Sequence, residues 1–127
     1  MNIKKYVFII VLIVSVVYLT GCYNDTEEKL YGTPVCNLDN VTYSLSVQPI
    51  IVNNCYACHS QANAPTNGSG IVLEGYDKLI VAVNNGLLIE SITHGPNASP
   101  MPKNAPQLSD CKINTIKKWI ENGALNN

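Results

Sequence analysis

The sequence predicts a small all-α domain within a chain of 127 residues. Three segments place apolar residues on one face of a helix: residues 47–51, residues 76–83 and residues 113–120. In the second of these, the apolar positions are i, i+3, i+4 and i+7, which is the repeat of an amphipathic helix. The stretches between them are rich in Gly, Pro and Asn, which interrupt regular structure. We find no internal repeat and no sign of a second domain.

The first helix is expected within residues 41–54, directly before a pair of cysteines. Ser44 or Ser46 can cap it, because a serine hydroxyl accepts a hydrogen bond from a free N–H of the first turn. Pro49 is best tolerated in that first turn, where its missing N–H would have no helical partner. This short helix would place Cys55 at the site that the cysteine pair forms.

The middle of the chain alternates loops with short helices. Residues 61–70 are rich in Asn, Gly, Pro and Ser and predict a loop, whereas residues 71–73 are too short an apolar run to assign. The helix of residues 76–83 should stop at Gly86, because glycine readily adopts the left-handed conformation that follows a helix. Residues 87–93 predict one or two further helical turns.

A rigid loop and a final helix complete the domain. Residues 94–108 are studded with Pro and Gly; proline fixes φ and removes N–H donors, so this segment cannot be regular structure. Ser109 is expected to cap the last helix, with Asp110 favourable to its dipole, and Gly123 to end it. The predicted buried face of this helix comprises Ile113, Ile116, Trp119 and Ile120, with Lys117 and Lys118 opposite.

The first residues have the pattern of a targeting segment. Lys4 and Lys5 precede an almost wholly apolar run, residues 6–19. As a helix this run would reach about 21 Å, which is short of the ~30 Å hydrocarbon core of a bilayer. It therefore predicts the apolar region of a signal peptide rather than a membrane-spanning helix.

The apolar run ends in Leu-Thr-Gly-Cys at residues 19–22, which resembles the lipobox of bacterial lipoproteins. The resemblance implies that residues 1–21 are a lipoprotein signal peptide and that Cys22 becomes the lipidated N-terminus. Residues 22–34 are then a polar tether, and residues 35–127 form the folded domain. An ordinary signal peptide with an incidental cysteine is the alternative.

Acidic residues follow Cys22 closely: Asp25, Glu27 and Glu28. They are typical of a solvated tether that holds a domain away from the bilayer. They also resemble the surface-export signals of some bacterial lipoproteins. Both interpretations stay open.

Cys55-Tyr56-Ala57-Cys58-His59 is the attachment signature of a c-type haem. Each thiol can add across a haem vinyl group to form a thioether, and two intervening residues let one short segment span the two vinyls. The adjacent histidine carries its imidazole under the iron. The motif therefore predicts one covalently bound haem.

Two other interpretations of the cysteine pair are open. A zinc site would need a second pair of ligands, but Cys36 and Cys111 are isolated from each other in the sequence. A redox dithiol normally lies in a βαβ setting, and no such pattern flanks this pair.

Export of the chain would affect both its thiols and its charge. In an oxidising compartment Cys36 and Cys111 are expected to form a disulfide, the alternative being two buried thiols that act as small apolar residues. Removal of Lys4 and Lys5 would change the formal net charge from −1 to −3. A mildly acidic body argues against nucleic acid or anionic lipid as a partner.

The order of these features resembles the class I cytochrome c domain over residues 41–125. A helix leads into the haem motif, a middle helix follows, then Ser-Pro-Met-Pro at residues 99–102, and then an amphipathic helix with Trp119 and a Gly-Ala sequence. The resemblance implies a small helical domain wrapped around one covalently bound haem, with the first and last helices packed together. Pro49 and the extra cysteines are departures from the pattern of the class.

The resemblance also implies the haem contacts of individual residues. Cys55 and Cys58 would form the thioethers, His59 would be the proximal iron ligand, and Met101 the distal ligand.

Met101 has one rival as the distal ligand, which is His94. Met101 follows His59 by 42 residues, and prolines on both sides restrict the backbone that carries it. Its thioether is a soft ligand that raises the reduction potential relative to a second histidine. The alternative is that Met101 merely fills space in the apolar interior. His94 precedes a Gly-Pro sequence and is expected to be a loop residue near the surface.

Two functions remain open. The first is an electron carrier, which does not act as an enzyme itself but can serve an enzyme complex. The second is a haem-based enzyme subunit or a gas or redox sensor, which needs a displaceable distal ligand. A catalytic haem would need an acid–base His or Arg near the iron; the chain has no Arg, and only His94 is spare. We therefore expect a carrier in the bacterial cell envelope, bound to the membrane by its lipid and serving redox partner proteins.

Replacing Cys22 tests the lipid anchor. Cys22→Ser should release the domain into a soluble fraction with its visible spectrum unchanged, because each buried CH₂ of an acyl chain contributes about 0.8 kcal/mol to membrane binding. Fractionation and N-terminal sequencing measure this outcome. A variant that stays in the membrane with its full N-terminus would instead indicate an uncleaved anchor.

Overall fold

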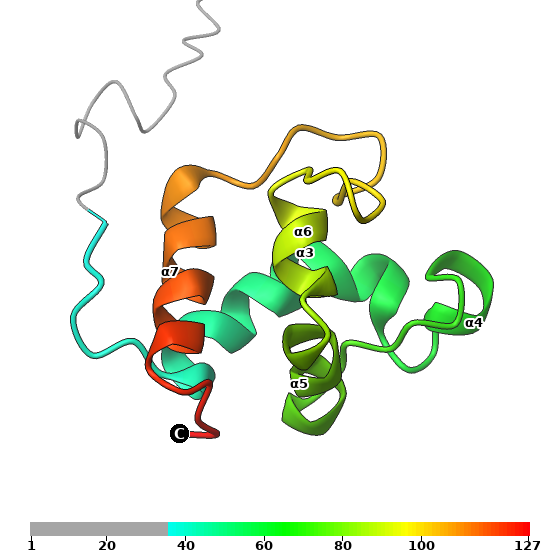
Figure 1. Ribbon diagram of the computed structural model, residues 1–127. Helices are drawn as coiled ribbons and strands as arrows, with labels where there is room; N and C mark the ends of the chain where they lie inside the picture. The colour runs from blue at the N-terminus through cyan, green and yellow to red at the C-terminus, as the bar shows by residue number, and fades with distance from the viewer. Residues whose placement is uncertain (1–35) are drawn as a thin grey trace, which may run out of the picture. The chain divides into compact units, whose positions relative to one another are not determined.

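Six helical segments make up the regular structure of residues 36–127, the part of the chain that this computed structural model describes (Figure 1). They are the π-helical turn η1 (Tyr43–Val47), α3 (Gln48–His59), α4 (Ala64–Asn67), α5 (Tyr76–Asn84), α6 (Leu87–Ile92) and α7 (Asp110–Glu121). No strand occurs in these residues, so the all-α prediction is confirmed for them. None of their helices is long and apolar enough to cross a membrane. The predicted signal peptide, Cys22 and the tether lie outside the described residues.

The first helical segment begins at a threonine, so the expectation of a serine N-cap is wrong. Thr42 Oγ1 accepts a hydrogen bond from the Leu45 N–H (3.3 Å), and the Ser46 hydroxyl accepts one from the Thr42 N–H (3.2 Å). The two side chains thus cap η1 reciprocally. Pro49 lies in the first turn of α3, which continues directly from η1. α3 then continues through the cysteine pair to His59, beyond the segment that the sequence predicts.

An aromatic cluster joins the first and last helical segments. The ring of Tyr43 lies 5.8 Å from that of Trp119 and 5.3 Å from that of Tyr76. Because Tyr43 and Trp119 are buried, this contact packs η1 against α7. The other buried apolar residues of the core are Val41, Val47, Ile51, Leu73, Leu79, Leu88, Ile92, Leu108, Ile113, Ile116 and Ala124.

The chain after α7 is tied back onto the domain. Gly123 has a left-handed φ of 93°. Its N–H donates to the Ile120 carbonyl and the Ala124 N–H donates to the Trp119 carbonyl, both in the last turn of α7, which is a Schellman cap. The Trp119 Nε1–H donates to the Leu125 carbonyl (2.8 Å), and the Tyr76 hydroxyl donates to the Ala124 carbonyl (2.9 Å). The cap therefore orients the segment that accepts hydrogen bonds from Trp119 and Tyr76.

The last residue completes this closure. The Tyr43 N–H donates to Asn127 Oδ1 (2.9 Å), and the Ser44 N–H donates to the Asn127 carbonyl (2.8 Å). These N–H groups belong to the first turn of η1, where no helical partner is available. Hydrogen bonds thus join the first helical segment of the folded domain to its last residue.

The other helix boundaries follow the sequence with two exceptions. α5 ends at Asn84, and Gly86 has a φ of 76°, as the sequence predicts. Ser109 occupies the N-cap position of α7, but its hydroxyl makes no capping hydrogen bond. The predicted loop of residues 61–70 contains the one-turn helix α4, with Pro65 in its first turn. The loop prediction is therefore wrong for these four residues of the segment.

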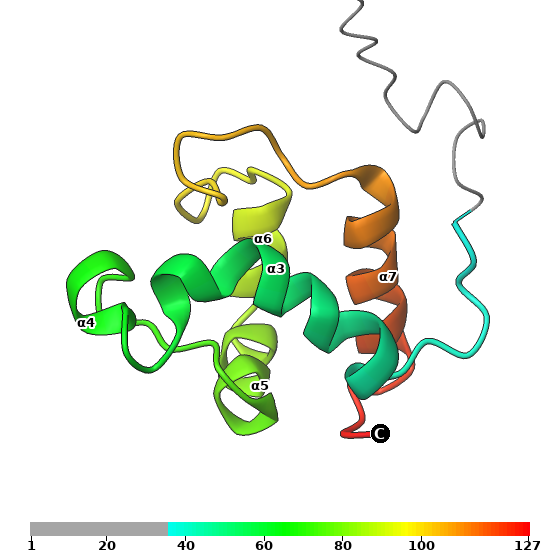
Figure 2. The ribbon, with the colours of Figure 1, turned by 180° about the vertical axis from the view of Figure 1, so that it is seen from behind.

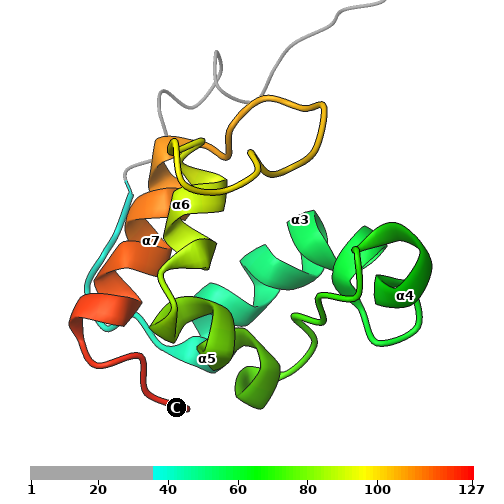
Figure 3. The same cartoon turned by 45° about the vertical axis from the view of Figure 1, so that its right-hand side comes forward.

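α3 crosses the domain from the side of α7 to the side of α4, as the front and back views show (Figures 1 and 2). α5 and α6 contact each other, and α6 also contacts α7. The loop between α6 and α7 runs along the upper edge of the domain in Figure 3. α3 therefore carries its C-terminal turn to the end of the domain opposite α7.

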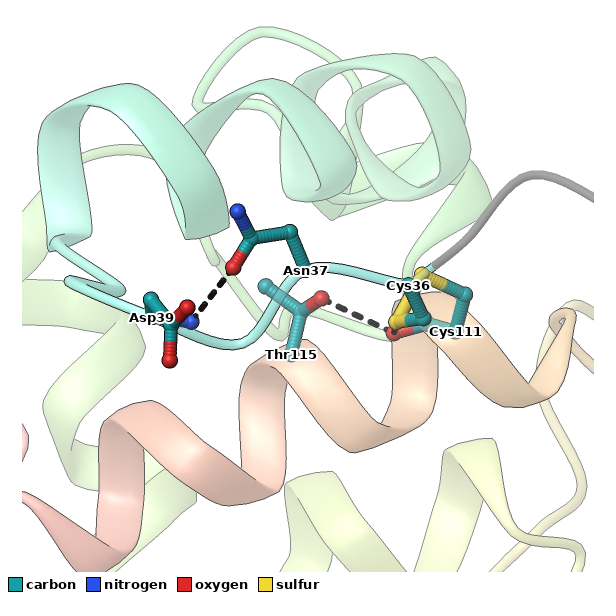
Figure 4. Close-up of a disulfide and its surroundings, with 5 residues drawn as sticks. All are labelled: Cys36, Asn37, Asp39, Cys111 and Thr115. Carbon is teal, nitrogen blue, oxygen red and sulfur yellow. Dashed lines mark hydrogen bonds between the residues drawn. A yellow bond between two sulfur atoms is a disulfide. The ribbon is translucent and has the colours of Figure 1, made fainter.

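A disulfide fastens the start of the domain to α7. Cys36 and Cys111, the pair that the sequence predicts, are bonded with their Cα atoms 5.4 Å apart (Figure 4). Next to the bond, the Asp39 N–H donates to Asn37 Oδ1 (2.7 Å) and turns the chain toward η1. The bridge spans 75 residues, so it constrains most of the domain.

Removing the bridge should destabilise the domain. Replacing both Cys36 and Cys111 by alanine should lower the free energy of unfolding by about 2–4 kcal/mol, because the unfolded chain regains the freedom of a long loop. Denaturant unfolding followed by circular dichroism measures this. Cys36→Ala alone should cause a similar loss, and a double variant as stable as the wild type would contradict the prediction.

Candidate functional site

The last turn of α3 brings the three motif residues together. Cys55 and Cys58 are three residues apart in α3 (Gln48–His59), so both thiols lie on one side of the helix. His59 follows Cys58 as the final helical residue. Cys55 is half-buried and Cys58 is exposed, so the pair lies where the helix emerges from the domain.

The imidazole of His59 is oriented by the main chain of a later segment. His59 Nδ1 lies 2.9 Å from the carbonyl oxygen of Ile71. A carbonyl oxygen only accepts hydrogen bonds, so Nδ1 carries the proton, and Nε2 of the neutral ring keeps a free lone pair. Metal-ligating histidines commonly fix their tautomer in this way.

The same segment also holds the main chain of the motif. The Leu73 N–H donates to the His59 carbonyl at 2.8 Å, two residues beyond the contact with the ring. Residues 71–73, which the sequence left unassigned, therefore bind His59 through both its backbone and its side chain. Leu73 is buried, which anchors this segment in the core.

A buried glycine lets the chain turn tightly beneath the motif. A Cβ at Gly68 would lie 2.5 Å from the Cys58 carbonyl oxygen and 3.0 Å from His59 Nδ1. Any larger residue would push on both groups. Asn63 supports the same turn, since its Nδ2 donates to the Ala57 carbonyl at 3.1 Å. The sequence indicated a loop here, but not these contacts with the motif.

The environment of Cys55 argues against a redox dithiol. Burial raises the pKa of the Cys55 thiol to about 11. Reactive cysteines of redox pairs have lowered pKa values, because the thiolate is the attacking species. A thioether, by contrast, has no ionisable proton and tolerates burial.

The surroundings of the motif also argue against a zinc site. Within residues 36–127, no group of three or more His, Cys, Asp or Glu side chains is close enough to hold a metal ion. A structural zinc site takes four such ligands. Cys36 and Cys111 are bonded to each other and cannot supply the missing pair.

Met101 lies on a separate loop, between α6 (Leu87–Ile92) and α7 (Asp110–Glu121). It is half-buried, and its N–H donates to the Ser91 carbonyl at 2.9 Å. In Figures 1 and 3 this loop, drawn yellow to orange, lies above the end of α3. No hydrogen bond joins the loop to the motif among the residues that the structure describes. The role of Met101 as distal ligand therefore stays a prediction.

His94, the rival ligand, is exposed and occupied elsewhere. Its Nε2 lies 3.1 Å from the Met101 carbonyl oxygen, where it can only donate. The expected surface position of His94 is therefore confirmed.

The donor set of these residues fits a covalently attached haem. The end of α3 offers two thiols on one helical turn and an imidazole with a free Nε2, while the thioether of Met101 belongs to the separate loop. Ile71, which contacts His59 through its carbonyl, has an exposed apolar side chain.

No protein-family model, curated protein or solved structure matches this chain.

Substitution of Gly68 tests the packing beneath the motif. Gly68→Ala should lower the free energy of unfolding by about 1–3 kcal/mol, because the added methyl group meets backbone that cannot move away easily. Asn67→Ala is the matched control: Asn67 is exposed, and its replacement should change stability by less than about 0.5 kcal/mol. Denaturant unfolding of both variants gives the comparison, and equal stability of the two would contradict the tight contact.

Proposed function

We propose that the chain is an electron-transfer c-type cytochrome, with one covalently bound haem and a lipid anchor at Cys22. The single observation that carries the proposal is the attachment motif in the last turn of α3, with His59 Nδ1 bound to the Ile71 carbonyl. Both thiols and the free Nε2 are then available to one ligand. No other donor set in residues 36–127 combines these groups.

Each site residue has a defined role in this proposal. Cys55 and Cys58 would hold the haem by thioethers, His59 would bind the iron through Nε2, and Met101 would bind it from the other side. The haem supplies a couple that takes up and releases single electrons. The chain would supply ligands that are held in place, so that the site rearranges little when the iron gains or loses an electron.

The surroundings favour a carrier over a haem enzyme. Acid–base catalysis needs a positioned proton donor or acceptor, which is most often histidine. The chain has no Arg, and the Nε2 atom of His94 is bound to the backbone carbonyl of Met101. Two filled axial positions would also exclude small ligands. The competing function, a haem-based enzyme subunit or sensor, requires that the distal ligand be displaced easily.

The proposed partners and location follow from the anchor and the charge. A lipid at Cys22 would hold the domain at a membrane of the bacterial cell envelope, where redox proteins exchange electrons with it. The weakly acidic chain offers nothing that favours nucleic acid.

The visible spectrum of the purified protein tests the function directly. In both oxidation states it should show a low-spin haem, and the oxidised protein should show the weak red absorption band of a sulfur–iron bond. Carbon monoxide added to the reduced protein should bind slowly. Rapid binding at neutral pH would favour the sensor or enzyme instead.

Met101→Ala identifies the distal ligand within the same experiment. The variant should lose the red band, show a lower reduction potential and bind carbon monoxide quickly, because the thioether raises the potential and blocks the iron. Gln107→Ala, on an exposed residue of the same loop, should change none of these properties. A Met101→Ala variant that keeps the band would disprove the assignment.

A further inference from the structure

We propose that His94 is a positioning residue, which holds Met101 in place through a hydrogen bond to its backbone carbonyl. The proposal rests on the proposed function, because Met101 matters only if it binds the iron. His94 Nε2 lies 3.1 Å from the Met101 carbonyl oxygen. Since that oxygen cannot donate, Nε2 carries the proton, and this nitrogen is not available as an iron ligand while the contact lasts.

The contact between His94 and Met101 closes the loop of residues 94–101. The backbone N–H groups at both ends of this loop donate to the same carbonyl oxygen. The N–H groups of His94 (3.2 Å) and Met101 (2.9 Å) both donate to the Ser91 carbonyl at the end of α6. The bond from the His94 ring then occupies the Met101 carbonyl as well. Both backbone polar groups of Met101 are therefore bound, although the loop is exposed.

The flanking residues remove much of the remaining freedom. Pro100 and Pro102 fix their own φ angles and restrict the residues before them. With its backbone held on both sides, Met101 retains freedom mainly in its side chain. This is the property required of a residue that must present a thioether at one fixed point.

A second set of contacts holds the chain directly after His94. The Gly95 N–H donates to the Glu90 carbonyl (2.8 Å), and the Glu90 carboxylate accepts from the Asn97 N–H and from Asn97 Nδ2 (3.3 Å each). A Cβ at Gly95 would meet the Glu90 carboxylate, so a larger residue there would displace this carboxylate from Asn97. His94 has a left-handed φ of 52°, and these bonds fix the chain that directly follows it.

Two replacements separate the hydrogen bond from the backbone conformation. His94→Asn keeps a residue that tolerates a left-handed φ, but its amide is too short to replace Nε2. His94→Gln places an amide nitrogen as many bonds from Cα as Nε2 is and can donate to the Met101 carbonyl. Gln107→Ala is the control on the same loop.

Amide hydrogen exchange of the haem-loaded full chain reads out the bond. Prolines flank Met101, so its N–H is the one exchangeable amide of residues 100–102. His94→Asn should speed exchange of this amide by about five- to tenfold, the effect of one lost hydrogen bond. His94→Gln and Gln107→Ala should stay within about twofold of the wild type, since the first keeps the bond and the second never touches it.

The red sulfur–iron band gives a second readout. In His94→Asn the band should persist at room temperature but disappear at a lower temperature than in the wild type, and His94→Gln should restore the wild-type midpoint. Equal behaviour of His94→Asn and Gln107→Ala in both readouts would overturn this proposal alone. A wild-type protein with attached haem but no red band would overturn the assignment of Met101, and this proposal with it.

The wild-type protein offers a measurement that needs no variant. Nitrogen-15 NMR of the neutral His94 ring should place its proton on Nε2. A proton on Nδ1 would mean that no bond to the Met101 carbonyl exists, and would overturn the proposal.

Discussion

The pairing of His59 with residues 71–73 is the interaction on which the site depends. The ring contacts the Ile71 carbonyl at 2.9 Å, and the Leu73 N–H reaches the His59 carbonyl at 2.8 Å. Together they fix the imidazole at the end of α3 and determine which nitrogen is free. Gly68 makes this pairing possible, because the chain between the partners must pass against the Cys58 carbonyl. The turn through Gly68 therefore also determines the orientation of the His59 ring.

The rest of the domain supports this turn from a small core. Domains of this size bury a limited fraction of their surface, so cross-links between distant residues matter more. Here the Cys36–Cys111 disulfide, the aromatic cluster and the bonds from η1 to Asn127 all join the beginning of the folded part to its end. They leave the α4 side, where the motif lies, dependent on its own hydrogen bonds.

The sequence predicted what local rules determine. Helical spacing correctly predicted that Val47 and Ile51 are buried and which face of α7 packs into the core. Gly123 correctly marked the end of α7. The disulfide followed from the number of spare thiols. Residues 71–73 and the contact of His94 with Met101 did not follow, because their partners lie 12 and seven residues away and no local preference specifies them. Thr42 replaced the expected serines as the N-cap because the segment starts earlier than its apolar stripe indicates.

The proposed function depends on covalent attachment of one haem to Cys55 and Cys58. Mass spectrometry of the denatured, protease-digested protein tests it most directly, because thioethers survive unfolding whereas coordinate bonds do not. We expect that the peptide containing both cysteines carries the mass of one haem and has no thiol that an alkylating reagent can modify. A peptide with two free thiols, from protein isolated with its full haem spectrum, would contradict covalent attachment.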